Sequence, residues 1–239
     1  GAERVVVILG HQRAEVESYL QANFPGKYVV ALQEEQKGTG HAVYSAKSFL
    51  ENGPECSVIV SGDVPNLDGE TLKGFLAASE GYEFAVMTAV LVDAAQYGRI
   101  LRTESGDVSG IIEYKDASPE QRAITEINAG FYVADSSFLL NELEALCSAE
   151  TNNAQGEYYL TDLVARAAEV SKVCGWKLPS VARMQGVNNR VDLANAERFA
   201  RAAINEKWML AGVTMLDPAT TYIQADVELA PDVVLYPQT

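Results

Sequence analysis

The sequence predicts an α/β fold in which a mixed sheet carries helices on both faces. Three observations lead to this prediction. Over the first 80 residues, short apolar runs alternate with amphipathic stretches, which is the order of a parallel sheet with crossover helices. From residue 83, apolar runs follow one another closely, as antiparallel strands do. Residues 190–210 contain neither Gly nor Pro, and their apolar side chains have helical spacing.

The first part of the chain opens with a β-branched run. Residues 4–9 (RVVVIL) are expected to form a strand buried on both faces of a parallel sheet. A second strand is expected at residues 28–32 and a third, also buried, at 56–61. Ligands of such sheets bind beyond the carboxyl ends of the strands, so the residues that follow each strand are candidates for a site. The helices expected between the strands cover residues 14–24, 41–50 and 69–80.

The middle of the chain is expected to add antiparallel strands. A hairpin is predicted where residues 97–103 and 108–114 flank the turn sequence ESGD. Gly130 lies inside a strand expected at 127–133, where a glycine often marks a close approach of backbones. The other expected elements are a strand at 84–92, helices at 136–148 and 159–170, and an extended piece at 176–184.

The C-terminal part is predicted to begin with a long connecting helix at residues 190–210, for which Asn189 is a candidate N-cap. After it, Ile223, Leu229 and Leu235 recur every six residues, and this period is typical of a parallel β-helix. Such solenoids need about three or more repeats for stability. The sequence holds fewer, so we expect only the start of the solenoid.

The composition argues against several classes of function. The formal net charge of −15, with no basic stripe, disfavours a nucleic-acid or anionic-membrane partner. A protein this acidic that handles phosphates needs local positive charge or a metal ion. Cys56, Cys147 and Cys174 form neither a disulfide framework nor a metal-ligand pattern, which favours a reducing cytoplasm. No signal peptide or apolar run of membrane-spanning length is found, so a cytoplasmic location is expected.

The stretch from Gln33 to Ala42 (QEEQKGTGHA) is the first candidate site. Gly38 and Gly40 leave the backbone bare on both sides of Thr39, so a flat ring or a phosphate can approach main-chain groups. The amide of Gln33 offers donors and an acceptor of the kind that binds a base edge. A GTG sequence is by itself more often an ordinary turn between a strand and a helix, without a role in binding.

Asp63 is the second candidate, since it follows a strand and precedes Val-Pro. A turn aspartate that caps the next helix is the simpler interpretation, whereas a carboxylate at a strand end also suits Mg²⁺. Similar alternatives hold for four further residues. Gly98 begins a strand, Glu113 ends one in a charge cluster, Asn128 lies on the way into an apolar strand, and Asn188 precedes the long helix.

Seven blocks in order resemble one known family. They are QEEQKGTGHA, SGDVP, YGRI, EYKDA, EINAGFYV, NNAQGEYYLTD and GVNNR, followed by hexapeptide repeats. This set resembles bacterial N-acetylglucosamine-1-phosphate uridyltransferases. In that family a pyrophosphorylase domain of the nucleotide-diphospho-sugar transferase (Rossmann-like) fold is fused to a left-handed β-helical acetyltransferase domain. The resemblance covers almost the whole chain.

The resemblance implies roles for individual residues. Gln33 and the backbone at Gly38 and Thr39 would bind the uracil of UTP. Asp63, as the catalytic residue, and Asn188 would hold Mg²⁺, the implied cofactor. The sugar of N-acetylglucosamine 1-phosphate, or of the product UDP-N-acetylglucosamine, would be contacted by Gly98, Glu113 and Asn128.

The resemblance also implies a domain organisation and an assembly. The nucleotidyltransferase domain is expected at residues 1–189, the connecting helix at 190–212 and the start of the β-helix at 213–239. The full-length parent would acetylate glucosamine 1-phosphate from acetyl-CoA and form a homotrimer through its β-helix.

The sequence departs from the family in two places. A glycine-rich loop of the type LAAGxGTRM, which binds the triphosphate, does not occur, and the β-helix is short. We therefore expect this polypeptide by itself to be poorly active. Two alternatives remain open: a pyrophosphorylase for another sugar 1-phosphate, and a non-catalytic regulatory or scaffold subunit. Retention of both Asp63 and Asn188 disfavours the second.

Overall fold

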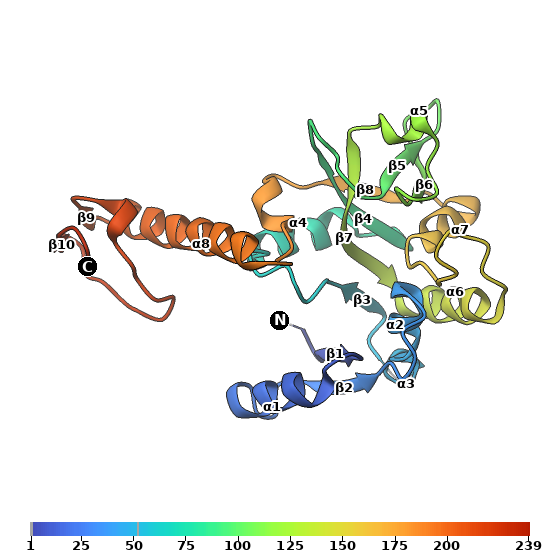
Figure 1. Ribbon diagram of the computed structural model, residues 1–239, viewed down its shortest axis with the longest axis horizontal. Coiled ribbons are helices and arrows are strands. Elements are labelled where there is room, and N and C mark those ends of the chain that lie inside the picture. Colours follow the sequence, from blue (N-terminus) through green and yellow to red (C-terminus); the bar gives the residue numbers. More distant parts are fainter. Residues whose placement is uncertain (1, 52) are drawn as a thin grey trace. The chain divides into compact units, whose positions relative to one another are not determined.

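The computed structural model describes residues 2–51 and 53–239 and divides the chain into two compact units (Figure 1). Unit 1 consists of Gly1–Val60 and Thr71–Pro179. Unit 2 consists of Ser61–Glu70 and Ser180–Thr239. The predicted boundaries at residues 189 and 212 stay a prediction.

Unit 1 is built on a six-stranded mixed sheet, as the sequence predicts. The strand order is β6–β5–β7–β4–β8, and β3 also pairs with β7. β7 runs antiparallel to β3, β4 and β5, whereas β8 runs parallel to β4. The strands are β3 (Cys56–Ile59), β4 (Phe84–Val90), β5 (Arg99–Arg102), β6 (Val108–Ile112), β7 (Glu126–Asp135) and β8 (Cys174–Lys177).

Helices cover both faces of this sheet at β4. Six consecutive residues of β4, Phe84 to Ala89, are buried, and alternate side chains of a strand point to opposite faces. On one face, Phe84 and Val86 pack with the apolar sides of α6 (Ser136–Ser148) and α7 (Asp162–Val170). On the other, Met87 lies beside Trp176 of β8, whose ring stacks on Phe75 of α4 (Gly69–Ala78) at 5.7 Å. The continuous apolar sequence of β4 is explained by this double cover.

Gly130 forms a bulge in β7. The register with β4 shifts between Val86 and Thr88, and Gly130 has a φ of 80°, which glycine adopts without steric cost. The close backbone approach predicted at this glycine is therefore a local bulge.

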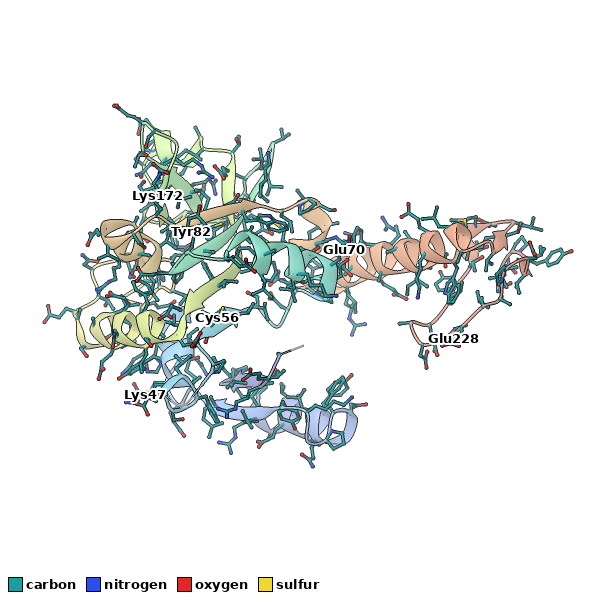
Figure 2. The ribbon with its side chains drawn as sticks, turned by 180° about the vertical axis from the view of Figure 1, so that it is seen from behind. Lys47, Cys56, Glu70, Tyr82, Lys172 and Glu228 are labelled. Carbon is teal, nitrogen blue, oxygen red and sulfur yellow. The ribbon has the colours of Figure 1, made fainter. Side chains whose placement is uncertain are left out.

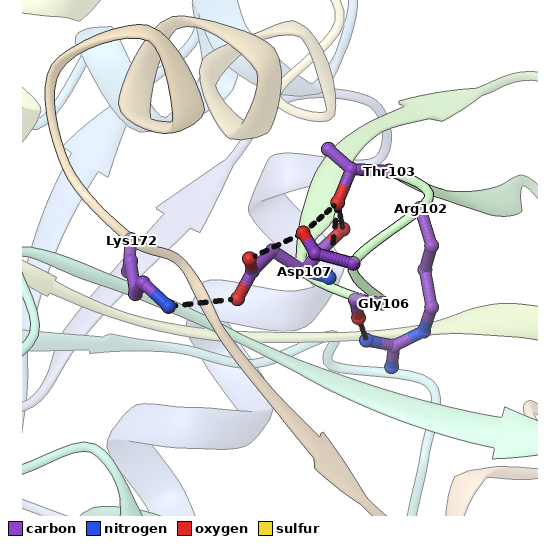
Figure 3. Close-up of polar contacts among 6 residues, drawn as sticks. Arg102, Thr103, Gly106, Asp107 and Lys172 are labelled. Carbon is purple, nitrogen blue, oxygen red and sulfur yellow. Dashed lines mark hydrogen bonds and ion pairs between the residues drawn. The ribbon is translucent and has the colours of Figure 1, made fainter.

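The predicted hairpin is formed by β5 and β6, which pair antiparallel. Its turn is closed by short-range polar contacts, drawn in Figure 3. Arg102 donates to the carbonyl of Gly106 at 2.7 Å, and Lys172 forms an ion pair with Asp107 at 3.2 Å. Arg102 also forms two bonds of 2.7 Å to Glu126, which ties the hairpin to β7.

The burial expected for the first and third strands is wrong. β1 (Val6–Leu9) and β2 (Val29–Leu32) form a separate parallel pair, and of the β1 residues only Leu9 is fully buried. β3 is half-exposed, and Cys56 at its start is exposed (Figure 2). In the described part of the chain β1 pairs only with β2 and β3 only with β7, so each strand is covered less than a central strand would be.

Several helix limits also differ from the prediction. The helix expected at 41–50 is two short helices, α2 (Thr39–Tyr44) and α3 (Lys47–Glu51), and where α2 ends the hydroxyl of Ser45 donates to the carbonyl of His41. The extended piece expected at 176–184 ends early, since Pro179 cannot donate to a strand ladder, and Val181–Met184 is a 3₁₀ turn. The first predicted helix is present as α1 (Arg13–Asn23), near its expected limits. The short α5 (Pro119–Arg122) was not predicted.

Unit 2 is dominated by α8 (Arg190–Leu210), which has the predicted limits. The side chain of Asn189 accepts hydrogen bonds from the amides of Val191 and Asp192, so its predicted N-cap role is confirmed. Beyond α8, the two-residue strands β9 (Thr214–Met215) and β10 (Val234–Leu235) pair in parallel. The left-handed β-helix stays a prediction. Across the residues that the structure covers, every helix is too short or too polar to cross a membrane.

The fully buried Leu143 of α6 provides a test of the unit 1 core. Leu143→Ala is expected to lower the free energy of unfolding by about 2–5 kcal/mol, because it removes apolar contacts and leaves a cavity. Val170→Ala, at a side chain that is 70% exposed in the same unit, should change it by less than about 0.5 kcal/mol. Urea unfolding measures both values, and equal effects would contradict the assigned core.

Candidate functional site

The glycine turn after β2 is held by the side chain of Gln33. Its amide donates to the carbonyl of Gly38 at 3.0 Å and lies 3.2 Å from Nδ1 of His41. Gly38 has a φ of 104°, and a Cβ placed on it would lie 2.6 Å from the carbonyl oxygen of Tyr158. Only glycine satisfies both constraints. The bare backbone predicted at this turn therefore leaves room for another segment of the protein to pack against it.

That segment is residues 158–161, which run beside the turn. The amide of Tyr158 donates to the carbonyl of Lys37, and its carbonyl accepts from the amide of Gly40, both at 2.8 Å. The amide of Leu160 donates to the hydroxyl of Thr39 at 3.0 Å. Three bonds therefore fix Thr39 and its neighbours against the segment just before α7.

Gly98, Glu113 and Asn128 lie side by side across three strands. Arg99 pairs with Ile112 of β6 and with Ile127 of β7, so the antiparallel register places Gly98 opposite both Glu113 and Asn128. The main-chain amide of Asn128 donates to the carbonyl of Gly98 at 2.9 Å. We call these three residues the Gly98 rung. The structure thus brings together the three residues expected to contact the sugar.

Gly98 leaves open the space beside the Glu113 carboxylate. A Cβ at position 98 would lie 3.4 Å from both Glu113 oxygens and 3.0 Å from a methyl group of Ile111. A side chain there would press on Ile111 and occupy the space beside the carboxylate. Glycine at this position therefore keeps a polar surface accessible.

The side-chain amide of Asn128 is oriented by residues of its own strand. Its Oδ1 accepts from the amide of Gly130 at 2.9 Å, and its Nδ2 donates to the hydroxyl of Tyr132 at 2.7 Å. Burial raises the pKa of Tyr132, which keeps this phenol neutral. The bulge at Gly130 therefore fixes which way Asn128 points.

Glu113 is the one member of the Gly98 rung that carries a charge. Thr161 donates to it at 2.9 Å, so the 158–161 segment also contacts this rung. Burial raises the pKa of Glu113, the hydrogen bond from Thr161 opposes that shift, and the nearby Asp162 and Asp116 add to it. Glu113 borders a cavity of about 150 Å³ together with Gln96, Tyr114, Lys115, Gln155 and Tyr159.

Asp63 and Asn188 lie together in unit 2. The amide of Val187 donates to the carbonyl of Asp63 at 2.9 Å. A Cβ on Gly186 would lie 2.9 Å from Oδ2 of Asp63 and 3.7 Å from Nδ2 of Asn188, so both side chains border the space that Gly186 leaves free. A carboxylate and an amide are suitable oxygen donors for a hard cation. Within residues 2–51 and 53–239, no group of three or more His, Cys, Asp or Glu forms a closed metal site.

Sequence reasoning did not single out Thr161, Tyr159 or Gly186. Thr161 and Tyr159 lie in the block NNAQGEYYLTD, and Gly186 lies in GVNNR. The sequence signal was present in these blocks. The hydrogen bond of Thr161 to Glu113 and the proximity of Gly186 to Asp63 each join segments more than 40 residues apart, and no local pattern shows such a pairing.

Substitution at Gly38 tests the close contact with residues 158–161. Gly38→Ala is expected to destabilise the protein by clearly more than about 2 kcal/mol, because the methyl group would strike the carbonyl of Tyr158 in addition to straining a positive φ. The matched control is Gly106→Ala, whose φ of 88° is similar but whose surroundings are open. Urea unfolding compares the two, and a loss at Gly38 no larger than that at Gly106 would contradict the contact.

The raised pKa of Glu113 predicts a pH dependence of stability. The folded protein holds this proton more tightly than the unfolded chain, so protonation favours folding. The contribution is fully present below the ordinary glutamate pKa of about 4 and is lost as pH rises through the raised value.

Glu113→Gln removes that titration. The free energy of unfolding of the wild type, minus that of the variant, should fall as pH rises from about 4 to 7. Urea unfolding at several pH values measures it, and Glu104→Gln, at an exposed site, corrects for the loss of one negative charge. A difference that rises with pH would show that Glu113 is stabilised in its charged form.

Comparison with known proteins shows the family of the chain. The sequence model of the nucleotidyl transferase family matches residues 1–177. The chain is 43% identical over 242 residues to the bifunctional protein GlmU of Exiguobacterium sp. strain AT1b and 44% identical over 242 residues to that of Exiguobacterium sibiricum. These alignments cover 100% of the chain and 52% of each relative. GlmU of Cutibacterium acnes is 42% identical over 98% of the chain and 57% of its own length.

The chain therefore spans about half the length of the curated relatives it matches. Among solved structures, a UDP-glucose pyrophosphorylase complexed with UDP-glucose has a TM-score of 0.57 at 17% identity, covering 76% of this chain and 78% of its own. HddC from Yersinia pseudotuberculosis has a TM-score of 0.52, also at 17% identity, covering 74% and 70%. Both agree with the mixed α/β fold. The sequence matches confirm the resemblance carried by the seven blocks, and the chain belongs to the nucleotidyl transferase family.

Proposed function

We propose that this chain carries the substrate-binding residues for uridylyl transfer from UTP to N-acetylglucosamine 1-phosphate, which gives UDP-N-acetylglucosamine and pyrophosphate. The observation that carries the proposal is the Gly98 rung, linked through Thr161 and residues 158–161 to the glycine turn. The GlmU relatives support the same activity.

The Gly98 rung has the chemistry of a site for an N-acetylated sugar. Glu113 accepts hydrogen bonds from sugar hydroxyls, and Asn128 offers a fixed amide to an acetamido group. Gly98 lets the ring approach the main chain.

The glycine turn suits a uracil base. The NH2 group of Gln33 is already held by the carbonyl of Gly38 and by Nδ1 of His41, and its Oε1 remains to accept a hydrogen bond from the N–H of a base edge. The backbone at Gly38 and Thr39 is held in place before any ligand arrives, because residues 158–161 are bonded to it. Preorganisation of this kind lowers the entropic cost of binding.

Asp63 and Asn188 are the proposed Mg²⁺ ligands. Mg²⁺ commonly takes one or two protein oxygens and completes its shell with water and substrate phosphates, so this pair is sufficient in type. When bound, the ion supplies positive charge to the phosphates in a protein whose net charge is −15.

The reaction needs no covalent enzyme intermediate. An oxygen of the sugar phosphate attacks the α-phosphorus of UTP, a new P–O bond forms, and the bond to the departing pyrophosphate breaks. The protein contributes by holding the reacting groups in line, and the Gly98 rung and the glycine turn fix the sugar and the base. A pyrophosphorylase for another sugar 1-phosphate is the nearest alternative, and a non-catalytic scaffold is not favoured by the relatives.

Calorimetric titration with UDP-N-acetylglucosamine tests the proposal. The wild-type chain should bind it about tenfold more tightly with Mg²⁺ than without, and should bind UDP-glucose, which lacks the acetamido group, at least tenfold more weakly. Asp63→Asn should abolish most of the Mg²⁺-dependent gain because it removes the anionic ligand.

Asp226→Asn is the matched control, since it makes the same charge change at an exposed site in unit 2. It should keep the full gain. A Mg²⁺ effect that survives Asp63→Asn would contradict the assigned metal ligands, and equal affinity for the two sugars would favour the alternative pyrophosphorylase.

A further inference from the structure

Arg99, the first residue of β5, is a buried cation without an acidic partner. It is 2% exposed, and in the described part of the chain no carboxylate lies within ion-pair distance of it. Burying a charge is costly unless hydrogen bonds replace the lost water. The hydrogen bonds of its guanidinium therefore indicate which parts of the structure it stabilises.

Every N–H group of the Arg99 guanidinium points at a main-chain carbonyl. Nη1 donates to Ala94 at 3.2 Å and to Tyr97, Nη2 donates to Ala95 at 2.9 Å, and both Nε and Nη2 donate to Arg122 at 3.3 Å. Three of the accepting residues lie in the loop that leads into Gly98, and the fourth, Arg122, ends α5 just before β7. A single planar group thus joins the two chain segments that precede Gly98 and Asn128.

A third segment contacts the same group. The guanidinium carbon of Arg99 lies 5.5 Å from the centroid of the Tyr114 ring, and Arg122 lies 4.6 Å from that ring, so both cations stack against it. Tyr114 directly follows Glu113. Gly98 and Glu113 are therefore next in sequence to residues that Arg99 contacts, and Asn128 follows Arg122 on the segment that enters β7.

The sheet register places Arg99 in the rung next to the Gly98 rung, with its side chain on the opposite face of the sheet. Arg99, Ile112 and Ile127 form the next rung, and successive side chains of a strand point to opposite faces. Arg99 borders a cavity of about 520 Å³ that differs from the 150 Å³ cavity beside Glu113, whose lining does not include it. Arg99 therefore acts through the chain segments it binds.

The loop before Gly98 is held in an unusual conformation by these bonds. Ala95 has a φ of 40°, a left-handed value that residues other than glycine rarely adopt, and its carbonyl is the one that accepts from Nη2 of Arg99. A conformation of this kind persists only when the surrounding contacts impose it.

We propose that Arg99 is a positioning residue for the sugar site, an inference that rests on the proposed function. Its guanidinium fixes the carbonyls of residues 94, 95, 97 and 122 and the ring of Tyr114. In this way it sets the spacing of Gly98, Glu113 and Asn128 that an N-acetylated sugar requires. A lysine retains the charge but lacks the planar set of five donors, so it cannot replace this role.

Calorimetry on the full chain tests the proposal with Arg99→Lys and Arg99→Gln. Affinity for N-acetylglucosamine 1-phosphate should fall about tenfold in the lysine variant and further in the glutamine variant, while affinity for UTP changes less than twofold. Arg102→Lys is the matched control on the same strand, where the arginine binds Glu126 and the hairpin turn, and both affinities should stay within twofold of the wild type.

Hydrogen–deuterium exchange without ligand provides a second readout. The amide of Asn128, which donates to Gly98, should exchange at least tenfold faster in Arg99→Lys and at the wild-type rate in Arg102→Lys. Retained sugar affinity and retained protection in Arg99→Lys would overturn the proposal. So would equal loss of affinity for UTP and the sugar phosphate, since that outcome indicates general destabilisation.

The exchange experiment also separates the two hypotheses. If the wild type binds neither UTP nor the sugar phosphate, the proposed function fails. The exchange rate of the Asn128 amide then still decides whether Arg99 positions the Gly98 rung.

Discussion

The hydrogen bonds made by residues 158–161 are the constraint on which the candidate site of unit 1 depends. They hold the glycine turn at Thr39 and Gly40 on one side and the carboxylate of Glu113 on the other. They add to the core packing shared by Val43 of α2 and Ile111 of β6, the elements next to the turn and to Glu113. Thr161 bonds to Glu113 through its side chain, whereas Lys37 and Gly40 bond to the main chain of Tyr158, which brings that backbone close to Gly38. This explains why a positive φ and the absence of a Cβ are both needed at Gly38.

Charge is distributed around the Gly98 rung in a way that the total of −15 does not reveal. Glu113 is buried, and the nearby Asp162 and Asp116 add to the rise of its pKa that burial causes. Behind the sheet, Arg99 carries a positive charge that is satisfied by carbonyl dipoles. Asp63 and Asn188 form a separate pair of oxygen donors in unit 2.

The prediction from sequence succeeded where the pattern is local. The limits of α6 and α8, the β5–β6 hairpin and the N-cap at Asn189 follow from periodicity, turn residues and capping preferences that involve neighbours in the chain. It failed for the burial of β1 and β3. An apolar sequence indicates that a strand favours burial, but it does not show how many neighbouring strands and helices cover it. It also missed the role of Thr161, whose bond to Glu113 spans 48 residues.

The sequence by itself determined the fold class, the order of the elements and the candidate residues, since ordered blocks such as SGDVP and GVNNR restrict both backbone and chemistry. Only the tertiary structure decided which candidates share a rung and which atoms hold them there. The register of β5 with β6 and β7 places Gly98 between Glu113 and Asn128, and the same register puts Arg99 behind them. A strand register is a choice among pairings of distant segments. It is fixed by the packing of both sheet faces, and no stretch of sequence contains that information alone.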